Sequence, residues 1–128
     1  MHKTGKGRAG EQYAAQVLEK AGMRILASNF RSPAGEVDLV AQDGDTIVFI
    51  EVKTWAKQGI FDLEYGIGHK KQQRIIETAK YFLMVHREYN GMTVRFDVVL
   101  VEGIPCPAAL PQRGPEICHL ASAFMEYV

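Results

Sequence analysis

Apolar residues recur at helical spacing in two segments of the chain. The first runs from about Gly10 to Ala21 and has Gly22 as a stop; its apolar positions are Tyr13, Ala14, Val17, Leu18 and Ala21. The second runs from His69 to Tyr89 and ends at Asn90-Gly91; its stripe includes Ile75, Ile76, Ala79, Phe82, Leu83 and His86. The two patterns predict two amphipathic helices.

Four other segments have the composition of strands, namely Met23–Phe30, Glu36–Gln42, Thr46–Trp55 and Val94–Val101. Ser32, Pro33 and Gly35 close the first of them. Asp43-Gly44 separates the second from the third, and this dipeptide is typical of a tight hairpin because both residues tolerate a positive φ.

The remaining segments show no clear period. Residues 1–8 are predicted to be a flexible lead-in, with a short basic, glycine-rich stretch at its end, and Ala56–Gly68 is predicted to be a loop. Gly103–Pro115 carries four of the five prolines and is expected to be irregular. The pattern of Ile117–Tyr127 fits a short strand and a short helix equally well.

The element order is therefore α-β-β-β-α-β plus a short C-terminal element. This order predicts an α/β fold, with a mixed β-sheet flanked by helices. At 128 residues, and with no long linker, the chain fits a single domain over residues 1–128.

Composition narrows the class of protein without identifying it. No run approaches 18 apolar residues and residues 1–8 lack an apolar signal core, so we expect a cytoplasmic chain that does not enter a membrane. Cys106 and Cys118 have no metal-ligand spacing. The 15 basic and 15 acidic residues cancel, so any affinity for nucleic acid must come from a local patch, a bound metal or a second subunit.

Candidate chemistry is concentrated between Gly35 and Trp55, in the sequence GEVDLVAQDGDTIVFIEVKTW. Because strand residues alternate between faces, Glu51 and Lys53 share one side of a strand that is otherwise apolar on both faces and so belongs at the centre of the sheet. Charges at the end of a buried strand need partners. The hairpin places Asp38 beside Glu51, which gives two adjacent carboxylates with a lysine close by.

Two adjacent carboxylates repel each other, and a hard divalent cation such as Mg²⁺ stabilises both in the ionised form. We expect Asp38, Glu51 and the carbonyl of Val52 to converge on one ion, with Lys53 orienting or deprotonating a water or neutralising developing charge. The alternative is a carboxylate–lysine pair that satisfies itself at a sheet edge. The residues alone leave both interpretations open.

An aspartate followed, across a hairpin, by an apolar run that ends in Glu-x-Lys resembles the PD-(D/E)xK nuclease superfamily. The wider pattern GRAGEQYAAQVLEKAGMRILASNFR, GEVDLVAQDGDTIVFIEVKT and KKQQRIIETAKYFL is similar to the YraN family of bacterial proteins. That family is described as endonuclease-like and related to archaeal Holliday-junction resolvases. The resemblance covers about Gly7–Leu100 and implies a restriction-endonuclease-like fold.

The resemblance also implies roles for individual residues. Asp38 and Glu51 match the metal-binding carboxylates, and Lys53 matches the catalytic lysine. Glu11, in the first helix, matches a glutamate that completes the metal site directly or through water in resolvase-like enzymes. Gln72 lies where related enzymes carry a polar residue that supports the site. Without the resemblance, the favourable place of Glu11 near a helix start is the better explanation of this residue.

Nucleic-acid contacts are implied for three further residues. Lys71 and Arg74 occupy basic positions of the long helix, where they would meet phosphates. Without the resemblance, Gln72 and Arg74 are most often solvated positions of an amphipathic helix. Trp55 stands where relatives commonly have a second basic residue; it would either stack on an unpaired base or pack under the following loop. Asp97, within an apolar strand, either pairs with Arg95 or lies near the site.

The leading hypothesis is a Mg²⁺- or Mn²⁺-dependent nuclease that hydrolyses DNA phosphodiester bonds, with branched or structured DNA as a candidate substrate. A preference for DNA structure would require two sites at a fixed spacing and hence a homodimer. The alternative is a non-catalytic nucleic-acid-binding or adaptor protein that retains the nuclease fold. A third hypothesis is a metal-binding protein unrelated to nucleic acid.

Overall fold

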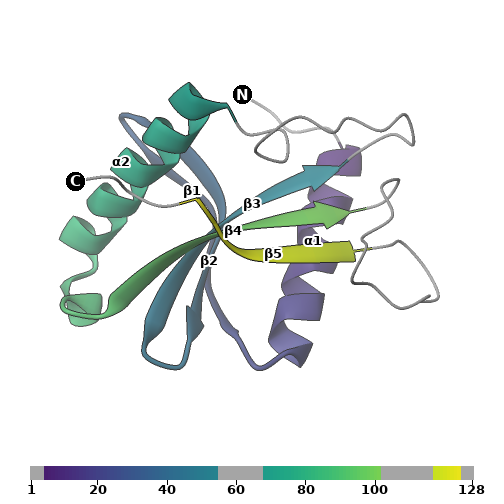
Figure 1. Ribbon diagram of the computed structural model, residues 1–128, viewed down its shortest axis with the longest axis horizontal. Coiled ribbons are helices and arrows are strands. Elements are labelled where there is room, and N and C mark those ends of the chain that lie inside the picture. Colours follow the sequence, from purple (N-terminus) through teal and green to yellow (C-terminus); the bar gives the residue numbers. More distant parts are fainter. Residues whose placement is uncertain (1–4, 55–67, 102–116, 125–128) are drawn as a thin grey trace.

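The computed structural model describes residues 5–54, 68–101 and 117–124. The described residues form two α-helices, a 3-10 turn and five strands (Figure 1). In chain order these elements are α1 (Gly5–Lys20), β1 (Arg24–Ser32), β2 (Gly35–Asp43), β3 (Thr46–Thr54), α2 (His69–Val85), η1 (Arg87–Tyr89), β4 (Thr93–Val101) and β5 (Ile117–Phe124).

The five strands make one mixed sheet in the order β1-β2-β3-β4-β5. β1, β2 and β3 form an antiparallel meander. β3 and β4 are parallel and lie on either side of α2 in the chain, and β5 returns antiparallel to β4. The predicted α/β class, the mixed sheet and the order of elements are confirmed, and the C-terminal element is a strand.

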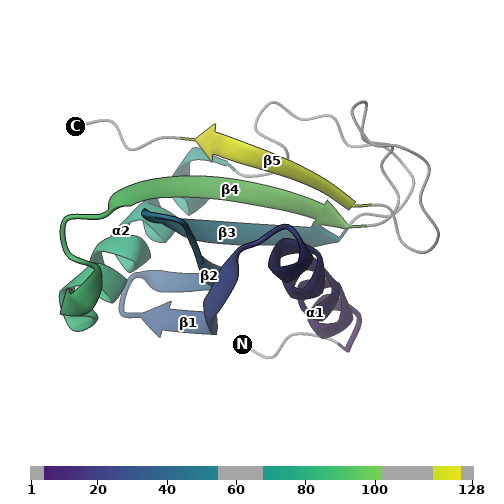
Figure 2. The ribbon, with the colours of Figure 1, turned by 90° about the horizontal axis from the view of Figure 1, so that it is seen from below.

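The helices cover opposite faces of the sheet (Figure 2). Ala14 and Leu18 of α1 pack on Leu39, Val48 and Ile50. On the other face, the apolar side of α2 packs on the sheet and forms a second cluster. Its members include Ile75, Ala79 and Phe82 of α2 and Val40, Ile47, Phe49 and Phe96 of the strands. β3 is the third of the five strands and is buried on both faces, as its continuous apolar run predicted.

The first helix starts earlier than the apolar period indicated. α1 begins at Gly5, whereas the period predicted a start near Gly10 and a flexible segment over residues 1–8. The segment Gly-Lys-Gly-Arg has no apolar residue, so it carries no amphipathic pattern, yet its backbone continues the helix. Residues 1–4 lie outside the described residues.

The second helix ends earlier than predicted. α2 stops at Val85, and the chain passes through the non-helical His86 (φ −109°, ψ 76°) into η1. The prediction ran on to Tyr89 because the stripe reaches His86 and Asn90-Gly91 is a typical helix stop. The rings of Phe82, His86 and Tyr89 do pack together, with centroids 4.3 Å apart for Phe82–His86 and 6.0 Å for Phe82–Tyr89, although the backbone between them is not α-helical throughout.

The hairpin between β2 and β3 is present, with a turn displaced by one residue from the prediction. Asp43 pairs with Thr46, so Gly44 and Asp45 are the central residues. Gly44 has φ 62° whereas Asp45 has no positive φ, which fits a type II′ turn with glycine at its first central position.

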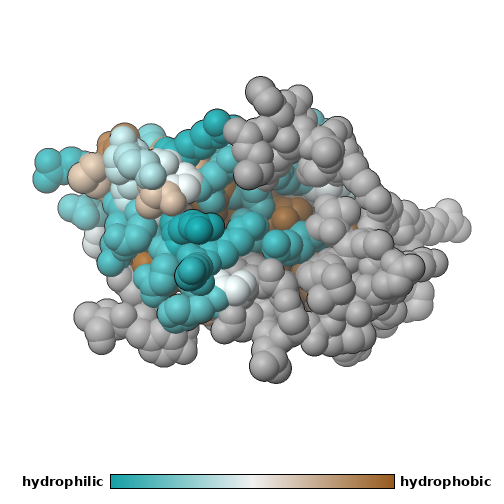
Figure 3. Space-filling model, turned by 90° about the horizontal axis from the view of Figure 1, so that it is seen from above, coloured by the Kyte–Doolittle hydropathy of each residue, from teal (hydrophilic) through white to brown (hydrophobic). Residues whose placement is uncertain are grey.

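Several predictions fall on residues that the structure does not describe. Trp55, most of the predicted 56–68 loop and the proline-rich 103–115 segment lie outside the described ranges. Seen from above in Figure 3, the described part of the surface is mainly hydrophilic with small apolar areas. None of the described helices is long and apolar enough to cross a membrane.

Candidate functional site

Asp38 and Glu51 lie on the same face of the sheet, where β2 and β3 separate. The ladder between these strands ends at the pair Leu39–Ile50, so Asp38 and Glu51 are the next residues outward. Phe49 and Val40 pack beneath α2. Because side chains alternate along a strand, Glu51, two residues beyond Phe49, faces α2 as well. The Asp38 side chain lies against Glu51 and forms a side-chain hydrogen bond with it.

Beyond the last backbone pair of β2 and β3, the Asp38 carboxylate takes the place of a backbone carbonyl as hydrogen-bond acceptor. Its Oδ2 accepts a hydrogen bond of 2.7 Å from the backbone N–H of Val52. The N–H and C=O of one strand residue point to the same side of the strand. The Val52 carbonyl is therefore directed toward the Asp38 side of β3, as the predicted convergence on one ion requires.

The Glu51 carboxylate is buried, with 5% of its side chain exposed. Burial, and then the neighbouring charge of Asp38, raise the pKa of Glu51 to about 7, and Lys71 offsets only part of this rise. An ionised carboxylate at this position therefore lacks sufficient positive charge around it. The deficit is what a bound cation would supply.

Two lysines from different elements meet at Glu51. Lys71, in the first turn of α2, places its Nζ 2.5 Å from Glu51 Oε2. Lys53, two residues beyond Glu51 on β3, interacts with both Lys71 and Glu51. Burial and the charge of Lys71 lower the pKa of Lys53. Burial also acts to lower the pKa of Lys71, but the Glu51 carboxylate outweighs it and the net change is upward.

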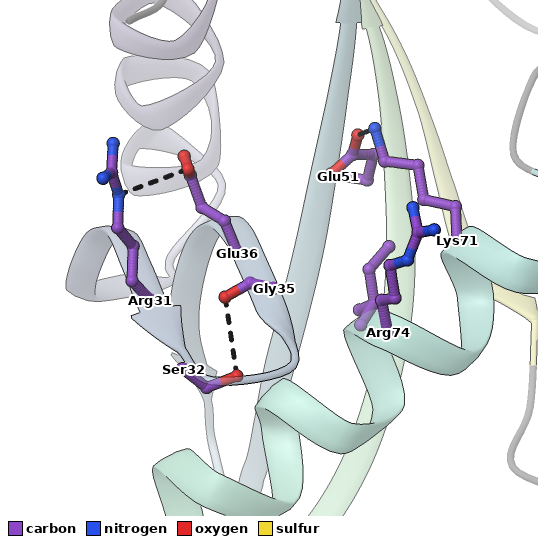
Figure 4. A pocket seen from close by; sticks show the side chains of 8 residues that line it. Arg31, Ser32, Gly35, Glu36, Glu51, Lys71 and Arg74 are labelled. Atoms are coloured by element: carbon purple, nitrogen blue, oxygen red, sulfur yellow. Dashed lines mark hydrogen bonds and ion pairs between the residues drawn. The ribbon is translucent and has the colours of Figure 1, made fainter. Parts of the chain in front are cut away.

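A groove of about 450 Å³ opens beside Glu51, between the β1–β2 hairpin and α2 (Figure 4). Its charged lining residues are Arg31 and Glu36 on the hairpin, Glu51 on β3, and Lys71 and Arg74 on α2. The two hairpin side chains form an ion pair of 3.4 Å. The groove is thus lined by three cationic and two anionic side chains.

Arg74 lies one turn after Lys71 on α2, and its side chain extends into the groove toward Lys71 (Figure 4). Its stem lies along Gly35: a Cβ added to that glycine would be 3.4 Å from Arg74 Cβ and 3.9 Å from Arg74 Cδ. Unlike Lys71 and Arg31, Arg74 makes no ion pair within the part of the chain that the structure describes. The guanidinium is therefore available to an anion in the groove.

The other predicted site residues have diverse positions. Gln72 is buried on α2, next to Lys71, rather than solvated. Glu11 is buried on α1 and lines a separate pocket of about 220 Å³ together with Ser28, Asn29 and Leu39. The structure thus brings Asp38, Glu51, Lys53 and Lys71 together and sets Arg74 beside them, whereas Glu11 lies in the α1 layer.

The sequence interpretation did not include Arg31 among the functional residues. A detectable signal was present, because the turn at 32–35 sets Arg31 directly opposite Glu36 in the β1–β2 register. Any hairpin closed by that turn would place the Arg31 side chain beside Glu36. Arg31 lines the groove from the β1–β2 hairpin.

Asp97 belongs to a different cluster on the α1 face. Its carboxylate is fully buried and accepts hydrogen bonds from Arg95 Nε (2.9 Å), Arg95 Nη2 (3.0 Å) and the Ser122 N–H (2.9 Å). His119 Nε2 lies 2.6 Å from Asp97 Oδ2. The predicted pairing with Arg95 is confirmed. The cluster ties β5 to β4 where their register shifts, between Phe96 and Val98.

The donor set at Asp38 and Glu51 suits a hard cation. Within the described ranges there is no group of three or more His, Cys, Asp or Glu residues that could hold a metal ion. Two carboxylates and a backbone carbonyl fit Mg²⁺, which takes one or two protein carboxylates and completes its shell with water or phosphate oxygens. They do not provide the four nitrogen or sulfur ligands typical of structural zinc.

Comparison with known proteins identifies relatives but no activity. A family model described as "Uncharacterised protein family UPF0102" matches residues 10–101. A UPF0102 protein of Treponema pallidum (strain Nichols) is 44% identical over 122 residues, covering 95% of this chain and 94% of the relative. Similar proteins from Treponema denticola (42% over 125 residues; 92% and 93%) and Persephonella marina (43% over 96 residues; 75% and 82%) carry the same description.

Proposed function

Because the chain belongs to the uncharacterised protein family UPF0102, whose description states no activity, we propose its function from the chemistry of the site: a metal-dependent nuclease that hydrolyses phosphodiester bonds in DNA. The observation that carries the proposal is the pair of carboxylates, Asp38 and Glu51, on one face of the sheet where β2 and β3 part. This family membership fits the resemblance to YraN proteins.

The metal would be Mg²⁺ or Mn²⁺, held by Asp38, Glu51 and the carbonyl of Val52. A divalent cation bound there would supply a water of lowered pKa and neutralise charge on the scissile phosphate. The raised pKa of Glu51 supports this assignment, because it indicates that the pair lacks positive charge.

The remaining groups bind and orient the reactants. Lys53 would orient the attacking water and accept its proton, which the lowered pKa of its ammonium group favours. Lys71 and Arg74 would hold phosphates in the groove. Gln72, buried next to Lys71, would support the site from α2. Completion of the metal site by Glu11 stays a prediction, because this residue lines a separate pocket on α1.

The order Asp38, hairpin, Glu51-Val52-Lys53 supports assignment to the PD-(D/E)xK superfamily with its restriction-endonuclease-like fold. The exposed groove, rather than an enclosed pocket, suits a polymer as substrate. Cleavage of a symmetric DNA junction would require two active sites at a fixed spacing, which a homodimer would supply. Branched or structured DNA is therefore the proposed substrate of such a homodimer.

Cleavage assays test the proposal. Purified protein is incubated with junction, flap and single-stranded DNA in Mg²⁺ or Mn²⁺. We expect cleavage that Asp38→Asn and Glu51→Gln each reduce by at least about 100-fold, the scale of losing a group that stabilises charge in the transition state. Asp45→Asn in the exposed hairpin turn and Glu77→Gln on the outer side of α2 are matched controls that retain activity.

A non-catalytic DNA-binding adaptor is the second candidate. The Lys71–Glu51 ion pair favours it, because it partly satisfies the site without a metal. The adaptor assignment replaces the nuclease if the unmutated protein shifts these DNAs in a gel, in a salt-dependent manner, but cleaves none of them with either metal.

A further inference from the structure

Lys71 forms an ion pair with Glu51 although the two residues have very different surroundings. The Glu51 side chain is 5% exposed, whereas that of Lys71 is 42% exposed and reaches inward from the first turn of α2 to place Nζ 2.5 Å from Oε2 (Figure 4). A lysine is a compact charge on a flexible four-carbon stem, so its ammonium can occupy more than one position without movement of the helix.

An anion bound in the groove would offer this ammonium a second partner. Arg74, one turn further on α2, lines the same groove and has no ion pair with any residue in the described ranges. An anion bound by Arg74 would therefore lie close to the exposed side of Lys71. Residues 71 and 74 are neighbours on a helix surface and can contact the same ligand.

The Glu51 carboxylate cannot bind the Lys71 ammonium and a divalent cation with full strength at the same time. A cation shared by Asp38 and Glu51 would bring a double positive charge next to the Lys71 ammonium, which already has the Lys53 ammonium beside it. Like charges at such a distance repel strongly in a partly buried site. Lys71 must then lose much of its attraction to Glu51.

We propose that Lys71 exchanges between two anions: it pairs with Glu51 when no divalent cation is bound, and with a DNA phosphate in the groove when Asp38 and Glu51 hold a cation. This inference rests on the proposed function. Its consequence is that metal and DNA each raise the affinity of the protein for the other. DNA draws Lys71 away from Glu51, which frees the carboxylate for the cation, and the cation releases Lys71 for the DNA phosphate. Linkage requires the coupling to be equal in both directions.

Metal affinity provides a test that does not depend on activity. Mn²⁺ binding is measured by isothermal titration calorimetry, with and without phosphorothioate DNA, for the wild type, Lys71→Met and Lys80→Met. Methionine has a similar length and no charge. Lys80 is the matched control, an exposed lysine on the same helix that pairs with Glu77. Circular dichroism verifies folding, and Lys71→Gln is used in place of Lys71→Met if the latter does not fold.

We expect Lys71→Met to bind Mn²⁺ at least about fivefold more tightly than the wild type in the absence of DNA, the lower end of coupling between linked sites. DNA should raise the Mn²⁺ affinity of the wild type by at least about the same factor and should raise that of Lys71→Met much less. Lys80→Met should behave as the wild type does. Fluorescence anisotropy should show weaker DNA binding by Lys71→Met when Mn²⁺ is present.

Equal or weaker Mn²⁺ binding by Lys71→Met overturns the exchange. If the wild type nevertheless cleaves DNA, the nuclease proposal survives that result. If the affinities change as expected but no DNA is cleaved, the exchange stands and the nuclease proposal fails.

Discussion

Glu51 makes the stability of the metal-free protein depend on pH. Its folded pKa of about 7 exceeds the ordinary value of 4.5, so the folded state binds the proton more tightly than the unfolded state. The contribution of Glu51 to the free energy of unfolding therefore falls as pH rises from about 4.5 to 7 and is constant above that range. The shift corresponds to about 3 kcal/mol.

Glu51→Gln removes this titration. Urea unfolding in EDTA at pH 4.5 and pH 8 should show the variant gaining up to about 3 kcal/mol relative to the wild type over that interval. Glu77→Gln, at an exposed position, should show no such change. A wild type and a Glu51→Gln variant with parallel pH profiles would contradict the account of the site.

Asp97 has the opposite electrostatic effect. Its burial acts to raise the pKa, but hydrogen bonds from His119, Arg95 and the Ser122 N–H outweigh it and lower the pKa below 3.8. The carboxylate therefore contributes stability that is fully present above pH 3.8 and is lost as pH falls through the folded pKa.

Asp97→Asn should lower the free energy of unfolding by about 3 kcal/mol at pH 7, because it leaves Arg95 facing an uncharged amide at a buried position. Chemical denaturation gives the loss, and amide hydrogen exchange should show that β5 is affected more than β3. A loss below about 0.5 kcal/mol, the level of an ordinary surface substitution, would exclude the proposed role of this cluster.

At the scale of the element, α2 is held to the sheet by aromatic packing. Phe82 is fully buried and its ring contacts Phe30 and Phe49 edge-on, with centroids 5.0 and 5.6 Å apart. Phe82→Ala should destabilise the fold by about 3–5 kcal/mol. Met84→Ala, two residues away and 64% exposed, should change stability by less than about 0.5 kcal/mol. Thermal and urea unfolding of both variants measure the difference.

The elements were largely predictable because each core face repeats at the period of its helix or strand. The ends of the helices were harder to predict. The Phe82, His86 and Tyr89 rings keep a helical spacing beyond the end of α2, and the start of α1 lacks apolar residues. The adjacency of Asp38 and Glu51 followed from strand alternation and one hairpin. The Lys71–Glu51 contact did not, since a helix pattern gives no rotation or distance relative to a particular strand residue.

At the scale of the whole molecule, a net charge of zero favours a local patch as the source of DNA affinity, and the groove is the candidate patch among the described residues. Its cations are Arg31, Lys71 and Arg74. A plot of log K against log salt for phosphorothioate DNA should therefore have a slope no steeper than about −3 for each bound chain. Arg74→Gln should reduce the magnitude of the slope by about 1 for each bound chain. A slope near about −6 for each bound chain would show that residues outside the groove dominate binding.

The central claim is that one aspartate and one glutamate, on two diverging strands, share a divalent cation. Electron paramagnetic resonance of Mn²⁺ measures the number of bound ions directly. The account predicts one ion per chain in the wild type and in Asp45→Asn, and loss of that ion in both Asp38→Asn and Glu51→Gln. Unchanged Mn²⁺ binding in either of these two variants, or none in the wild type, would contradict it.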